Sequence, residues 1–170
     1  MSVPPAPRPL KAVVLAAGDS PEGELVDPPP GDFRGGLVAL GLAYVELLLR
    51  PRMTDLIRAV ISESGRFPEL RERIFNFGTL PVFAAVQRFF VSANASGIAE
   101  VDDPDQAAAQ FLGMISTVVF WPRLIHGGWS LSDQETRRVV DEAALTIVAR
   151  YGASVATIPR SGHRRGDPGT

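Results

Sequence analysis

Few side chains in this 170-residue chain are suited to catalysis or metal binding. The chain has no cysteine, which excludes disulfides, thiolate metal sites and cysteine nucleophiles. One of its two histidines, His126 in "PRLIHGGW", lies near the end of an expected helix, where the helix dipole favours a cation. The pattern offers it no nucleophile and no orienting carboxylate. We therefore expect no enzyme activity, no metal site and no cofactor.

The stretch "LKAVVLAAGDSPEGE" at residues 10–24 is similar to the opening of sugar nucleotidyltransferases, where an apolar strand leads into a glycine-rich phosphate loop. Such loops need successive glycines and a basic residue beside the phosphates. Here Gly18 is followed by Asp19 and, three residues on, by Glu22, whose carboxylates repel phosphate. No alternation of strands and helices follows. We therefore expect a short strand or an irregular leader, and no nucleotide site.

The composition is that of a globular protein with little net charge. Hydrophobic residues make up 45% of the chain and the formal net charge is -2. A nucleic-acid-binding domain usually carries a basic field, so direct DNA binding is doubtful. The longest apolar run, "LVALGLAYVELLL", contains Glu46 and is shorter than the roughly 18 residues of a membrane span. With no basic segment before "KAVVLAAG", we expect no secretory signal, no membrane contact and a cytoplasmic protein.

Proline and glycine divide the chain into three parts. Eight of its fifteen prolines lie between Pro4 and Pro30, and proline inside a helix removes a donor and clashes with the preceding turn. Residues 1–33 are therefore predicted to be an irregular leader. Residues 153–170 are predicted to be a disordered polar tail, and residues 34–152 the folded domain.

The folded part has helical spacing throughout and predicts an all-α fold, a bundle of about five to six helices. One helix is predicted after Pro51 and ends at Ser64 and Gly65. Another is predicted to begin at Pro68. A third apolar row follows a break at Gly78 and Pro81. The rows are Met53, Leu56, Ile57, Val60 and Ile61; Leu70, Ile74 and Phe77; and Val82, Val86, Phe89 and Ala93.

The two carboxyl-terminal helices predict contact with another chain. Asp103 and Pro104 are a strong helix start, and the helix "AAAQFLGMISTVVFW" that follows has no charged residue. One side can serve the domain's own core, and the other is too apolar to face water. The last helix opens with Ser132 and Glu135 as a capping box and ends at Gly152. Its apolar rows are Val139, Ala143, Ile147 and Tyr151, beside Val140, Ala144 and Val148, and the alanines allow close helix approach.

Two junctions carry a resemblance to a known family. "DLIRAVISESGRFPELRERIFNFG" resembles the junction of the sixth and seventh helices in TetR/AcrR-family transcriptional regulators, particularly the AefR-like carboxyl-terminal domain. "GIAEVDDPDQAAAQFLGMI" resembles the next junction of the same family, in the right order and at the right separation. The resemblance covers roughly Gly36 to Gly152.

The resemblance implies a ligand-sensing and dimerisation domain, in which two carboxyl-terminal helices from each subunit form a four-helix bundle. The side chains expected in this interface are Ile115, Val119, Val140, Ala143, Ala144, Ile147 and Val148. It also implies a pocket for a small apolar effector. Its expected lining is Tyr44, Phe75, Phe83, Gln87, Phe111, Met114 and Trp121. Aromatic residues at helical spacing are also typical of a plain core, and that alternative stays open for each of them.

The leader departs from the family pattern. Such regulators begin with a DNA-binding unit of about 45 residues whose helix-turn-helix reads the major groove. The leader has no cap–helix–turn–helix pattern and few basic residues. We therefore expect a TetR-like effector domain without its own DNA reader: a truncated regulator, or a partner that forms a homodimer or a heterodimer with full-length relatives. The alternative is a stand-alone protein that binds small hydrophobic ligands without a regulatory role.

Overall fold

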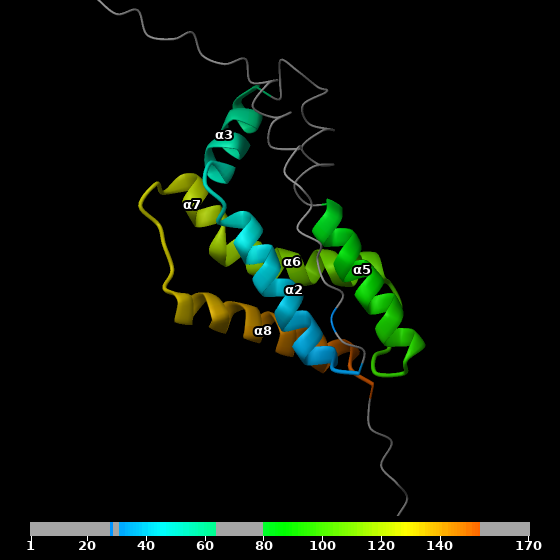
Figure 1. Ribbon diagram of the computed structural model, residues 1–170. Helices are drawn as coiled ribbons and strands as arrows, with labels where there is room; N and C mark the ends of the chain where they lie inside the picture. The colour runs from blue at the N-terminus through cyan, green and yellow to red at the C-terminus, as the bar shows by residue number, and fades with distance from the viewer. Residues whose placement is uncertain (1–27, 29–30, 64–79, 154–170) are drawn as a thin grey trace, which may run out of the picture.

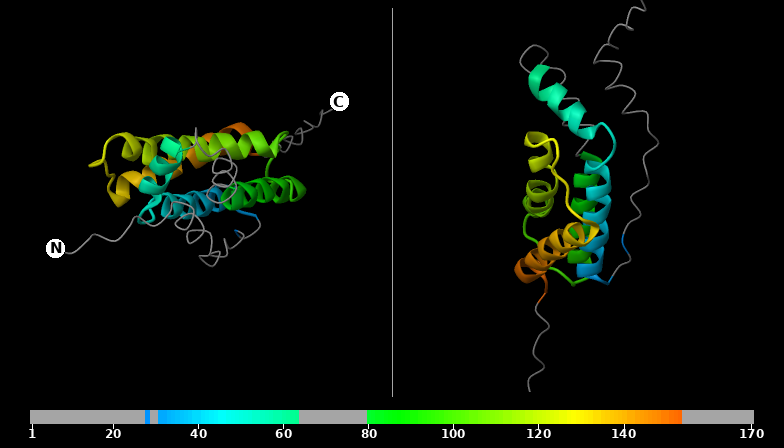
Figure 2. Two further views of the ribbon diagram at one scale, coloured as in Figure 1. Left: turned by 90° about the horizontal axis from the view of Figure 1, so that it is seen from above. Right: turned by 90° about the vertical axis from the view of Figure 1, so that its left-hand side faces the viewer.

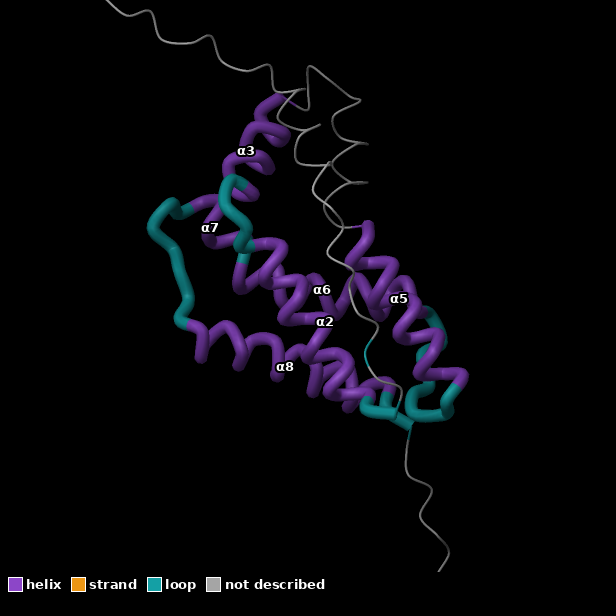
Figure 3. Tube along the Cα trace, in the orientation of Figure 1, coloured by secondary structure: helices purple, strands orange, loops and turns teal. Residues whose placement is uncertain are grey.

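The computed structural model describes residues 28, 31–63 and 80–153, which form six α-helices (Figure 1). They are α2 (Phe33–Leu48), α3 (Met53–Glu63), α5 (Leu80–Ala95), α6 (Pro104–Val119), α7 (Trp121–Ile125) and α8 (Asp133–Tyr151). No strand occurs in these ranges, apart from an isolated bridge between Ala99 and Gly152 (Figure 3). The predicted all-α fold is confirmed. The leader up to residue 27, the predicted helix from Pro68 and the tail lie outside the described residues.

Four of these helices form two packed layers. α2 and α5 lie side by side in one layer, and α6 and α8 form the other, with α7 continuing beyond α6 (Figure 2, left). α2 packs on both α8 and α6, and α5 packs on α6. α3 leaves this core and contacts α7 at one end of the bundle (Figure 1). The first described helix, α2, therefore packs against the last one, α8.

The ends of the long helices are fixed by local side-chain caps. The Asp32 carboxylate accepts a hydrogen bond from the backbone N–H of Gly35 at 2.8 Å, and Asp103 accepts one from Gln106 at 3.0 Å. Ser132 and Glu135 form the predicted capping box at the start of α8. Each cap satisfies backbone donors that have no partner inside the helix.

Two glycines let α2 approach its neighbours closely. A Cβ atom on Gly36 would lie 2.3 Å from the ring of Phe89, and one on Gly41 would lie 2.6 Å from Val140 Cγ1. Both distances are far shorter than an ordinary carbon–carbon contact of about 3.5–4.0 Å. Glycine at these two positions is therefore required by the packing of α2 against α5 and α8.

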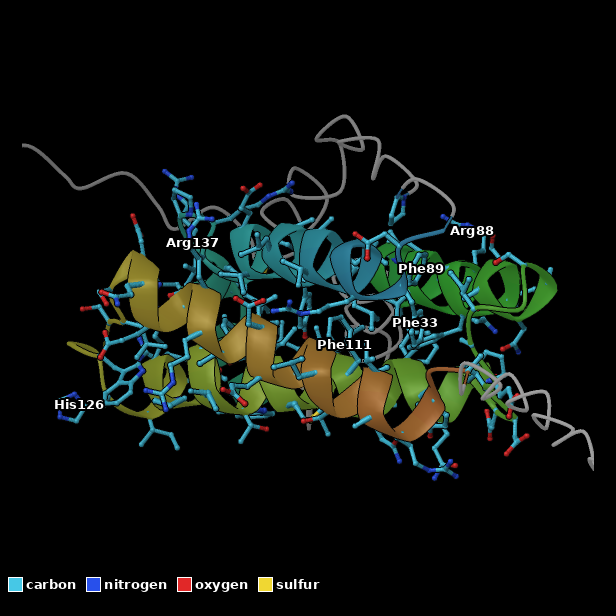
Figure 4. All side chains as sticks on the ribbon, turned by 90° about the horizontal axis from the view of Figure 1, so that it is seen from below. Phe33, Arg88, Phe89, Phe111, His126 and Arg137 are labelled. Atoms are coloured by element: carbon cyan, nitrogen blue, oxygen red, sulfur yellow. The ribbon has the colours of Figure 1, made fainter. Side chains whose placement is uncertain are left out.

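Aromatic side chains fill the space between the layers. Phe33 stacks on Phe89 with ring centroids 5.9 Å apart and meets Phe90 edge-on at 6.1 Å. Phe111 of α6 is fully buried, and Figure 4 shows Phe33 and Phe111 between the helices while His126 projects away from the bundle. The predicted row of α5, Val82, Val86, Phe89 and Ala93, is buried here.

The outer end of the bundle is held by Arg58 of α3. Its guanidinium donates from Nε to the Leu124 carbonyl at 2.9 Å and from Nη2 to the Arg123 carbonyl at 2.8 Å. These carbonyls belong to the last turn of α7 and have no partner inside so short a helix. Arg58 therefore ties α3 to α7.

Candidate functional site

An open groove runs between α6 and α8, on the side of both helices that faces away from their buried rows. Its volume is about 690 Å³. The lining is mostly apolar and comes from these two helices alone: Gly113, Met114, Thr117, Val118, Glu135, Arg138, Val139, Glu142, Ala143 and Thr146. Ligand and partner sites are commonly concave and mainly apolar. The groove is therefore the candidate functional site.

Each of the two helices contributes a small residue to the lining of the groove. Gly113 lies in the middle of α6, and Ala143 lies on α8. The hydroxyl groups of Ser116 and Thr117 both donate to the Gly113 carbonyl, at 3.3 and 2.8 Å. These two hydroxyls are thereby satisfied within their own helix, so this part of α6 presents mainly apolar surface.

An apolar stripe extends the groove beyond the end of α6. Val118 is 39% exposed, Trp121 51% and Ile125 85%. Val118 lines the groove, and Trp121 and Ile125 follow it in α7. Exposed large apolar side chains gathered in this way indicate an interaction surface more than a solvated helix face.

The rim of the groove on α8 is charged, with both signs present. Glu135, Arg138 and Glu142 follow one another at helical spacing along it. Hydrogen bonds from the Ser132 hydroxyl and backbone N–H lower the pKa of the Glu135 carboxyl below its ordinary value. The rim therefore combines two carboxyl groups with one guanidinium group.

A buried tyrosine links α2 to α6 beneath the groove. Burial raises the pKa of the Tyr44 phenol above its ordinary value of 10.0, and a side-chain hydrogen bond with Ser116 opposes this shift. The neutral phenol is therefore the form that the core holds.

Other kinds of site are not visible in the described part of the chain. There, no three His, Asp or Glu side chains gather as a metal ion would require. Among the same residues, no helix is long and apolar enough to cross a bilayer.

The comparisons with known proteins identify the family. Residues 35–153 match the family model described as the carboxyl-terminal domain of AefR-like transcriptional repressors. The chain belongs to the TetR family of transcriptional regulators. The match covers more than two-thirds of the chain and begins within α2, as the resemblance of the two junctions implied.

Solved TetR-family structures have the same fold. A regulator from Mesorhizobium loti MAFF303099 is 21% identical with a TM-score of 0.67, over 85% of this chain and 66% of that one. One from Pseudomonas syringae pv. tomato DC3000 is 21% identical with a TM-score of 0.64, over 85% and 71%. The flavonoid-responsive regulator FrrA is 21% identical with a TM-score of 0.63, over 88% and 74%. This chain thus spans about two-thirds of the first regulator's length. No curated protein matches it significantly.

Within this TetR-family fold, six of the seven side chains expected in the dimer interface are already covered by their own chain. Ile115, Val119, Val140, Ala143, Ala144 and Ile147 are each at most 3% exposed, and Val148 is partly buried. They pack toward α2 and the rest of the core because α2 lies over the inner rows of α6 and α8. Of these seven side chains, only Ala143 also lines the groove between α6 and α8.

The side chains expected around an effector do not surround one hollow in the described residues. Tyr44 and Phe111 lie in the core, Phe83 is packed against it, and Phe75 lies outside the described residues. Gln87 donates a hydrogen bond to Asp105 at the start of α6. Met114 lines the groove, and Trp121 lies on the exposed stripe. For Tyr44 and Phe111 the structure favours the plain-core alternative.

Sequence reasoning missed Gly113, Thr117 and Arg138 as members of a site. The absence of charge along residues 107–121 predicted a covered outer face, but it did not indicate which residues form that face. The glycine inside "FLGMIS" was the available signal, because glycine in a helix interior calls for a packing reason.

Proposed function

We propose that this chain is the effector-sensing and self-associating domain of a TetR-like transcriptional regulator. The open groove on α6 and α8 carries the proposal, because it is a mainly apolar hollow of about 690 Å³ on the two carboxyl-terminal helices. The family match over residues 35–153 supports a regulatory role and a non-catalytic one. In that role the chain acts in the cytoplasm.

The association is proposed to cover the groove and the stripe that extends it. Val118 of α6 lies at the point where the two meet and is 39% exposed. A glutamate there places a charge in a desolvated contact, which strongly disfavours association unless it is paired. Val91 of α5 is 55% exposed and does not line the groove, so it offers a matched control for the same substitution.

Light scattering at micromolar concentration tests this proposal. Wild type and Val91→Glu are expected to be dimeric and Val118→Glu monomeric, all with the same helical circular dichroism. A wild-type chain that is strictly monomeric contradicts the self-association. A Val118→Glu chain that stays dimeric moves the contact to another face.

The effector is proposed to be small and largely apolar. The core of the domain is aromatic, with Phe33, Phe89 and Phe90 in mutual contact. FrrA, which shares the fold, is flavonoid-responsive, and a flat aromatic molecule is therefore a suitable first probe. Saturable binding of a flavonoid, measured by calorimetry, supports the effector role, and a panel of flavonoids without binding heat contradicts this choice of class.

The partner in the cell is proposed to be a second copy or a full-length TetR-like regulator, with no direct DNA binding by this chain alone. The formal net charge of -2 supports this, because DNA-binding surfaces are basic. A gel-shift titration with DNA from upstream of the gene tests it. Specific binding by this chain alone at physiological salt contradicts the proposal.

A further inference from the structure

Gly113 differs from the two glycines that α2 needs for its packing. A Cβ on Gly36 or Gly41 would collide with a neighbouring helix, whereas one on Gly113 would meet no heavy atom within 4 Å. Gly113 also lies in the interior of α6, nine residues after its first residue, Pro104, and has no positive φ angle, so no turn requires it. Within residues 31–63 and 80–153, no contact explains a glycine at this position.

A helix-interior glycine is unfavourable relative to alanine, because its backbone loses more freedom on folding. At position 113 the missing side chain leaves free space in the groove. It lies on the floor of the groove, with Met114 and Thr117 beside it and Ala143 on the facing helix. None of the described residues places an atom in this space.

The charges on the rim indicate which occupant fits. In a two-fold symmetric contact the same surface faces itself, so it must be self-complementary. Glu135, Arg138 and Glu142 give the rim both signs, and a second copy therefore brings an arginine toward glutamates and glutamates toward an arginine. The uncharged floor between them suits a helix backbone.

We propose that a second copy of this chain covers the groove with a helix backbone directly over Gly113, so that the missing side chain sets how closely the two copies approach. This inference rests on the proposed self-association and specifies its contact point. Gly113 thus determines how closely the second copy can approach. The rim charges favour a partner that carries the same arrangement of charges.

The test places side chains into this space and measures the dissociation constant by sedimentation. Gly113→Ala is expected to weaken association at least tenfold, because in a symmetric pair the added methyl group occurs twice. Gly113→Leu is expected to give a monomer. Ala39→Leu adds similar bulk on an exposed position of α2, outside the groove, and is expected to leave the constant unchanged. Unchanged circular dichroism shows that the variants fold.

The outcomes separate this inference from the proposed function. A monomeric wild type overturns both. A dimeric wild type whose association survives Gly113→Leu overturns the inference and leaves self-association intact. If Gly113→Leu abolishes binding of a flavonoid probe while the dimer persists, the occupant is a small molecule, and the inference is again overturned.

Two variants with reversed rim charges test whether these charges determine the association of identical copies. Arg138→Glu makes the rim wholly acidic and is expected to abolish self-association. Mixing this variant with Glu142→Arg, whose rim is mainly basic, is expected to restore a mixed dimer. Recovery in the mixture also shows that both variants are folded. Equal self-association of wild type and Arg138→Glu refutes a role for the rim charges.

Discussion

Replacing Gly41 with alanine is expected to destabilise the domain, although alanine is the better helix former. The added Cβ would lie 2.6 Å from Val140 Cγ1 and 3.1 Å from both Ile115 Cδ1 and Phe111 Cζ. All three side chains are fully buried. To restore an ordinary carbon contact, Val140 would have to move by about 1 Å into a core that leaves it no free space.

The expected size follows from two opposing effects. Alanine gains about 1 kcal/mol of helix propensity over glycine. Inserting a methyl group into a packed core costs about 1–3 kcal/mol. The net expectation is a loss of about 1 kcal/mol, which is about 2 kcal/mol less favourable than the same substitution in open space.

Urea unfolding followed by circular dichroism measures this difference. With a slope of about 2 kcal/mol/M, the midpoint of Gly41→Ala is expected to fall by about 0.5 M. Ala39→Gly on the exposed side of the same helix supplies the propensity reference and is expected to lose about 1 kcal/mol. If Gly41→Ala gains as much as Ala39→Gly loses, α2, α6 and α8 do not meet as closely as described.

Two further predictions concern Tyr44 and Arg58. Burial raises the pKa of the Tyr44 phenol, so the stability that the buried phenol contributes is complete below pH 10.0 and is lost as pH rises above that value. Absorbance titration should show one late-ionising tyrosine, and Tyr44→Phe should remove it. An unchanged titration curve in Tyr44→Phe would refute the assignment. Arg58→Ala is expected to loosen α7 with less than about 1 kcal/mol of global destabilisation, since the donor is exposed. The chain's two tryptophans, Trp121 and Trp129, lie in or beside α7 and report on its exposure. Iodide quenching of their fluorescence should increase in Arg58→Ala and not in the control Arg52→Ala. Equal quenching in both variants would show that Arg58 does not hold α7 in place.

The starts of α6 and α8 could be predicted from the local sequence. Asp103 followed by Pro104, and Ser132 followed by Glu135, were predicted as starts of α6 and α8, and both caps form as expected. Each depends only on residues within one turn, so no knowledge of the tertiary fold is needed. The break after α6 was missed: Pro122 has no N–H to donate to the Val118 carbonyl, and a separate short helix, α7, follows.

The orientation of the helix faces was less predictable. Val140 and Ala144 were expected to face a partner, yet they are buried against their own chain, because α2 occupies that side of α8. Ile61 was expected on a buried row of α3 and is 58% exposed among the described residues. The spacing of apolar residues in the sequence identifies an apolar row on a helix. Which element covers that row depends on how helices distant in sequence pack against each other.

The pairing of α2 with α8 has a consequence for how the protein is made. α2 is apolar on nearly every side and is the first described helix to be synthesised, whereas α8, which covers part of it, is the last. Contacts between elements so distant in sequence form late and slow the folding of a helical domain. Until translation reaches α8, the nascent chain keeps Leu37, Leu40 and Tyr44 without their full cover, which makes this interval the one most exposed to aggregation and to chaperone binding.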